Sequence, residues 1–146
     1  MTLISQTIQA TVTTALFALW SFPTPEPVLE GQATYMRPGL MAQVAANKSL
    51  DLTPYAGAVA LNRAGDLGRV AWLQWPATKT RPELVEGPFL VIDCAQRGQH
   101  FAKREHQHRI AEVSYNLATL HGFAGVGPAP VTVWFHKPPA ARSPSP

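Results

Sequence analysis

The feature that most constrains the fold is the apolar run inside the segment Gly87-Pro88-Phe89-Leu90-Val91-Ile92-Asp93-Cys94. Four large apolar residues in succession leave no polar face along residues 89–92. Such a run is typical of a strand buried on both sides, and the Gly-Pro breaker before it argues against a helix. We therefore predict that residues 89–92 form a strand paired on both sides and are among the least exposed residues.

Asp93 ends this run, at the point where the strand leaves the core. A carboxylate partly removed from water at such a position suits proton transfer. The alternative is a structural Asp that accepts backbone N–H groups near a turn. The segment alone leaves both interpretations open.

Composition indicates the class of domain around this strand. The 146 residues are enough for one domain, and 46% apolar residues allow a substantial core. Fourteen prolines, which cluster at the two ends and beside the expected strand boundaries, favour a β-rich domain with short strands. The formal charge of +3 fits attraction to an anionic polymer but does not indicate nucleic acid, which we do not expect as a partner. A single cysteine, Cys94, excludes an internal disulfide.

The N-terminal residues differ from the rest of the chain. Residues 1–25 carry no charged side chain, and residues 10–22 are mostly apolar. We expect residues 1–22 to be an export signal or, through residues 8–22, a membrane anchor, which implies an exported, periplasmic or cell-envelope protein. A hydrophobic helix docked on the domain is the alternative. Three prolines mark residues 23–30 as a linker, the domain is expected at residues 31–136, and residues 137–146 are expected to be a disordered tail.

Local patterns predict the other elements. Strands are expected at residues 32–35, 57–61, 69–75, 110–113 and 131–135. Short helices are expected at residues 38–48 and between a capping Ser114 and a terminating Gly122. Residues 77–86 are expected to be a polar loop.

Four segments, in this order, resemble the rare lipoprotein A (RlpA) family. Gly31-Gln32-Ala33-Thr34-Tyr35 resembles its opening Gly-x-Ala-Ser/Thr-Tyr/Trp segment, and residues 87–94 resemble its Val-x-Val-x-Asp segment. Arg109-Ile110-Ala111-Glu112-Val113-Ser114 resembles its Arg-Ile-Ile-Asp-Leu-Ser segment, and residues 131–133 match the closing strand. The resemblance covers about residues 31–135. It implies a six-stranded double-psi β-barrel with two short helices, in an envelope protein that binds or cleaves peptidoglycan or another polysaccharide.

Two departures from the family bear on activity. Family members that cleave glycan carry a His in an Ala-Ala-His segment, and the matching residues 55–62 contain none. The family's Asp-Arg-Gly-Pro becomes Asp93-Cys94-Ala95-Gln96, which keeps the acid but not its neighbours, and the second acid is Glu112 rather than Asp. The resemblance implies that Asp93 and Glu112 approach one groove, where a protonated and an ionised carboxyl would suit acid/base work on a glycosidic bond. We predict a glycan-binding protein. The alternative is a lytic-transglycosylase-like enzyme that uses Asp93 as acid/base.

Four residues are predicted to contact the glycan: Tyr35, Trp75, Arg97 and Arg109. The aromatic rings would stack on sugars, and Trp75, beside Pro76 at a strand end, is expected to be the exposed tryptophan. The arginines would contact an anionic wall polymer. His106 and His108, with His100 and Cys94, are the possible metal ligands, but no second ligand pair has a recognised spacing. We therefore predict neither a metal nor a cofactor.

Overall fold

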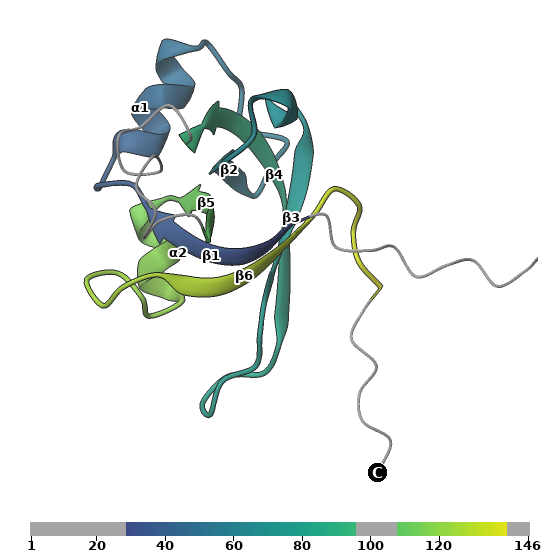
Figure 1. Cartoon of the computed structure of the whole chain (residues 1–146). Coiled ribbons are helices and arrows are strands. Elements are labelled where there is room, and N and C mark those ends of the chain that lie inside the picture. Colours follow the sequence, from purple (N-terminus) through teal and green to yellow (C-terminus); the bar gives the residue numbers. More distant parts are fainter. Residues whose placement is uncertain (1–28, 96–107, 140–146) are drawn as a thin grey trace, which may run out of the picture.

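The computed structural model describes residues 29–95 and 108–139 and shows a closed six-stranded β-barrel with two short helices beside it (Figure 1). The strands are β1 (Leu29–Tyr35), β2 (Gly57–Leu61), β3 (Val70–Trp75), β4 (Leu84–Cys94), β5 (Arg109–Val113) and β6 (Ala129–Trp134). The helices are α1 (Leu40–Asn47) and α2 (Tyr115–Leu120), and a 3₁₀ turn, η3, spans Ala64–Asp66. The mainly β architecture, the six-stranded barrel and the two short helices are thus confirmed.

The strand order around the barrel is β1-β5-β2-β4-β3-β6, and β6 pairs with β1 to close it. Two pairs are parallel, β1 with β5 and β2 with β4. The other four pairs are antiparallel. Each parallel pair joins strands that are not consecutive in the chain. Closure gives every strand two neighbours, which removes the open sheet edges that would otherwise invite aggregation.

The central strand β4 confirms the prediction for residues 89–92. Phe89 and Val91 face the barrel interior, whereas Leu90 and Ile92 pack in a second cluster with Met41 of α1. The four residues are between 1% and 8% exposed. In this segment β4 pairs with β2 on one side and β3 on the other. The run has no polar face because one side fills the barrel and the other lies beneath α1.

Local chemistry accounts for the start of α1 and for both ends of α2. Gly39 precedes α1 with a φ of 77°, so the helix begins at Leu40 rather than at the predicted Pro38. The Ser114 hydroxyl accepts a hydrogen bond from the Leu117 N–H at 3.1 Å, which confirms the predicted cap of α2. Gly122, with a φ of 76°, follows the end of α2, as predicted for a helix stop.

The structure also corrects other predicted boundaries. Residues 29–30, assigned to the linker, belong to β1 and pair with Val133 and Thr132 of β6. Residues 84–86, assigned to a loop, belong to β4 and pair with β3, because the hairpin ladder continues past the barrel. Pro138, assigned to the tail, is buried. Lys137 and Pro139, also assigned to the tail, are exposed. Residues 23–28 of the linker, residues 140–146 of the tail and residues 1–22 lie outside the described residues.

Residues 76–86, here called the hairpin arm, project from the barrel (Figure 1). The arm connects β3 to the buried part of β4. Across residues 29–95 and 108–139, no helix combines the length and the apolar character needed to cross a membrane.

Candidate functional site

The two predicted carboxylates lie on strands separated by one other strand. Asp93 of β4 pairs with Ala60 of β2, and Ala60 pairs with Glu112 of β5. Strands in a sheet are spaced by roughly 4.7–4.9 Å, so the Cα atoms of the two acids lie about 10 Å apart. The barrel therefore brings Asp93 and Glu112 into one row across three strands.

Asp93 lies in an ion-paired environment. Its Oδ1 atom accepts a hydrogen bond from the Cys94 N–H at 2.9 Å and lies 3.3 Å from the Lys48 ammonium. Lys48 also donates to the Ile92 carbonyl, which fixes the ammonium beside the strand. The Asp93 side chain is 38% exposed. These contacts match the structural Asp that accepts a backbone N–H group, the alternative to proton transfer.

A cavity of about 360 Å³ lies over the parallel pair β1 and β5. Its lining consists of Thr34, Tyr35, Arg109, Glu112, Gly127 and Pro128. We call it the β1–β5 cleft. The register of the two strands places Gln32 opposite Arg109 and Thr34 opposite Glu112. Three predicted site residues, Tyr35, Arg109 and Glu112, therefore meet in one cavity, whereas Asp93 is not part of its lining.

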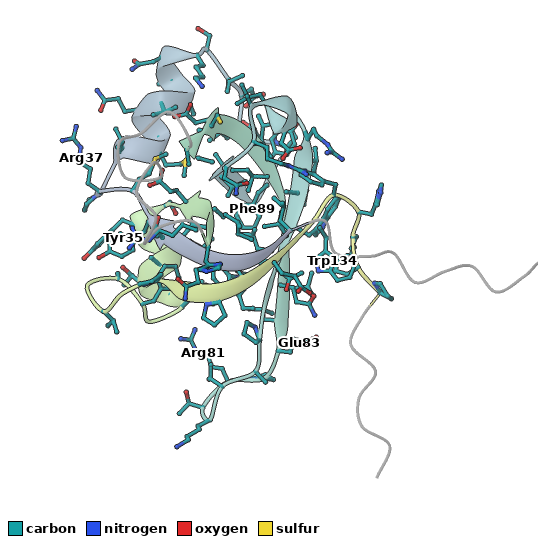
Figure 2. All side chains as sticks on the ribbon, in the orientation of Figure 1. Tyr35, Arg37, Arg81, Glu83, Phe89 and Trp134 are labelled. Carbon is teal, nitrogen blue, oxygen red and sulfur yellow. The ribbon has the colours of Figure 1, made fainter. Side chains whose placement is uncertain are left out.

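Tyr35 is held in a fixed orientation at the end of β1 (Figure 2). Its hydroxyl accepts a hydrogen bond from the Gly125 N–H at 2.7 Å. Its ring meets Tyr115 and Phe123 edge-on, with centroid separations of 5.7 and 6.0 Å. A phenol that accepts one bond can still donate its own proton. The ring is thus a rigid wall of the cleft with a polar edge.

Trp75 is not the exposed tryptophan that the sequence suggested. It is 5% exposed, its Nε1–H donates to Glu86 Oε2 at 2.8 Å, and its ring stacks on His121 at 4.3 Å. The prediction failed because the chain continues past Pro76 as the hairpin arm and turns back, which brings Glu86 beside the ring, and because His121 at the end of α2 stacks on it. Trp75 instead borders a second cavity of about 250 Å³, which we call the arm pocket.

Sequence reasoning missed the polar residues around the arm pocket. Glu86 Oε2 lies 2.7 Å from His121 Nε2, and Arg81 donates to the carbonyls of Leu120 and His121. These contacts join residues separated by 35 to 40 positions. No short motif marks such distant pairs.

Arg97, His100 and His106 lie outside the described residues. Within residues 29–95 and 108–139, no group of three or more His, Cys, Asp or Glu side chains is arranged to hold a metal ion. The β1–β5 cleft contains one acid, Glu112, and one guanidinium, Arg109, whereas the arm pocket contains Arg81 and His121.

The fold and the cleft define a small closed β-barrel with a polar surface cavity that contains an aromatic wall. Comparison of the chain with protein-family models, with curated proteins and with solved structures finds no match in any of the three.

Proposed function

We propose that this protein is a cell-envelope protein of the rare lipoprotein A-like double-psi type that binds peptidoglycan or another polysaccharide through the β1–β5 cleft. The observation that carries the proposal is the meeting of Tyr35, Arg109 and Glu112 in one cavity. These residues come from two segments that are far apart in the chain and that both resemble the family.

The strand pairing supports the same proposal. The segments 31–35 and 109–114, which carry the family-like sequence, pair with each other as β1 and β5 and form the floor of the cleft. Each of the two parallel pairs, β1 with β5 and β2 with β4, joins strands that are not consecutive in the chain, and the proposed double-psi arrangement would account for both pairs.

The chemistry of the cleft suits a sugar better than a purely apolar ligand. A sugar ring offers hydroxyl groups that both donate and accept hydrogen bonds, and C–H faces that pack on aromatic rings. Arg109 supplies donors, Glu112 supplies acceptors, and the Thr34 hydroxyl supplies both. Tyr35 and Pro128 supply apolar surface. The formal charges of Arg109 and Glu112 cancel, so the cleft suits an uncharged stretch of polysaccharide.

A second candidate function is glycan cleavage with Asp93 as acid/base. The row formed by Asp93, Ala60 and Glu112 favours it, because two carboxylates near one another can divide the acid and base roles. Binding is the stronger proposal, since Asp93 is paired with Lys48 and does not line the cleft.

The test is to incubate the full-length chain with purified, insoluble peptidoglycan and to measure both sedimented protein and soluble products. We expect sedimentation without products. Arg109→Gln and Glu112→Gln should each weaken binding by roughly tenfold, because each removes a charge-assisted hydrogen bond. Arg37→Gln is the matched control, since Arg37 is exposed and does not line the cleft (Figure 2).

The outcomes separate the two functions. Soluble products that disappear in Asp93→Asn would establish the enzyme, because the amide keeps the shape but cannot exchange the proton. Absence of both sedimentation and products would refute the binding proposal. Cleavage that survives Asp93→Asn would exclude Asp93 as the acid/base.

A further inference from the structure

The arm pocket lies between the hairpin arm and the end of α2, apart from the β1–β5 cleft. Most of its lining is apolar, and includes Pro76, Pro82, Leu84 and Pro130. Its polar side chains are those of Thr78, Arg81 and His121. No carboxylate is part of its lining among the described residues. The pocket thus combines an apolar interior with a cationic edge.

Arg81 is positioned before any ligand arrives. Its Nη1 atom donates to the Leu120 carbonyl at 2.8 Å, and its Nη2 atom donates to the His121 carbonyl. A Cβ atom at Gly122 would lie 3.0 Å from Nη2, so the guanidinium sits in space that a glycine leaves open. A guanidinium has five N–H donors, and these two bonds leave three. Because the side chain is already ordered, a ligand that binds it meets less of the usual entropy cost.

His121 is held in place by Glu86 and Trp75. Its Nε2 atom lies 2.7 Å from Glu86 Oε2, the oxygen that also accepts the Trp75 Nε1–H. Glu86 Oε2 is therefore shared between the His121 and Trp75 rings. The ring stacks on Trp75, and its side chain is 8% exposed. The Glu86 carboxyl group therefore contacts His121 and Trp75, and Glu86 does not line the pocket.

We propose that the arm pocket binds a small organic carboxylate with an apolar body. The carboxylate accepts hydrogen bonds from the remaining N–H groups of Arg81, and the apolar body lies against Pro76, Leu84 and Pro130. A guanidinium is the side chain best suited to a carboxylate, because its N–H groups match the two oxygens.

The neighbouring cavity shows why the charge pattern is selective. A cavity of about 410 Å³ shares Pro76 and Pro130 with the arm pocket, but its lining carries Glu30 and Glu83 in place of Arg81 and His121. Arg81 and Glu83 are both on the arm (Figure 2). An anion is therefore repelled from one cavity and attracted to the other.

The experiment uses the full-length chain and three probes of the same shape: 3-phenylpropionate, its neutral amide, and 3-phenylpropylamine. Titrations followed by NMR of the tryptophan indole N–H signals give affinity and location together. We expect the carboxylate to bind roughly tenfold to a hundredfold more tightly than the amide, as a charge-assisted hydrogen bond should, and the amine to bind most weakly. The Trp75 signal should shift most.

The variants test whether Arg81 causes the preference. Arg81→Gln should bring the carboxylate and the amide to equal affinity, whereas Lys79→Gln, which removes the same charge from an exposed residue outside the lining, should leave the preference intact. If Arg81→Gln does not fold, the ratio of carboxylate affinity to amide affinity in the wild type decides alone.

An acetylated dipeptide ending in Phe, with a free or amidated terminus, distinguishes two sources of the carboxylate, a peptide C-terminus and a free small acid. Tighter binding by its free acid than by 3-phenylpropionate identifies a chain terminus, and the reverse identifies a free small acid.

Three results would overturn the proposal: equal affinity for carboxylate and amide, no binding of any probe, or a largest shift at Trp134, which lines the acidic cavity instead.

Discussion

The two halves of β4 show how one strand can belong to two different environments. Residues 89–92 are paired with β2 and β3, and they are buried on both faces. Residues 84–86 are paired with β3, and across the described residues no second strand pairs with them. Leu84 is 45% exposed, whereas Leu90 is 8% exposed. The inner half therefore stabilises the barrel, and the outer half forms the wall of a pocket.

The difference teaches that burial on two faces, more than strand pairing, decides how much a residue contributes to stability. Each half has backbone hydrogen bonds to β3. Only the inner half buries its side chains both inside the barrel and beneath α1. Substitutions along β4 should therefore have effects that decrease from the inner half to the outer half.

The largest loss of stability is expected for Phe89→Ala. Phe89 is 4% exposed and packs in the barrel interior, so the substitution leaves a cavity. The free energy of unfolding should fall by about 3–5 kcal/mol. Denaturant unfolding followed by tryptophan fluorescence measures this. Leu120→Ala is the control, because Leu120 is 65% exposed. Equal losses for the two variants would contradict the assignment of Phe89 to the core.

The second largest loss of stability is expected for Gly87→Ala, at the junction between residues 84–86 and residues 89–92 of β4. Gly87 has a φ of 151°, and an added Cβ would lie 2.6 Å from Cδ1 of Trp72 and 3.0 Å from the Ala71 carbonyl. Backbone strain and overpacking together should lower the free energy of unfolding by about 2–4 kcal/mol. Gly65→Ala is the matched control, since no atom lies within 4 Å of its added Cβ. A Gly87→Ala variant as stable as Gly65→Ala would show that the junction relaxes freely.

The fold was predictable where a pattern was local. The apolar run, the Ser114 cap and the Gly122 stop each act through neighbouring residues, and each is confirmed. Residues 84–86 were assigned to the polar loop expected at residues 77–86. Only their pairing with β3, a tertiary contact, makes them a strand.

The third largest loss of stability is expected for Glu86→Leu. Glu86 Oε2 is the acceptor for the Trp75 Nε1–H and the partner of His121 Nε2, so its loss leaves two nearly buried polar atoms without this partner. The free energy of unfolding should fall by about 1–3 kcal/mol. Glu83→Leu is the control, because Glu83 is an exposed carboxylate of the same arm. A smaller loss for Glu86→Leu than for Glu83→Leu would show that the Trp75–Glu86–His121 contacts do not stabilise the arm.

The two cavities differ in how far the sequence alone could predict their residues. Glu112 was predicted from the family resemblance, Tyr35 as an aromatic ring that could stack on sugars, and Arg109 as a cation that could contact an anionic polymer. Parallel pairing of β1 and β5 brings the three together. Arg81 and His121 meet through a contact between the arm and the end of α2, 40 residues apart. Because neither residue lies in a recognisable motif, only the three-dimensional structure identifies the arm pocket.

The smallest effect on stability is expected for Leu84→Ala, compared with Leu90→Ala in the same strand. Leu90→Ala should cost about 2–5 kcal/mol, whereas the half-exposed Leu84 should cost less than about 1 kcal/mol. Leu84 lines the arm pocket, so its truncation should still weaken 3-phenylpropionate binding several-fold by removing apolar contact area. Unfolding curves and the NMR titration measure the two quantities on one sample. A Leu84→Ala variant with lower stability but unchanged affinity would reverse the roles assigned to the two halves of β4, because the outer half would then support the fold and not the pocket.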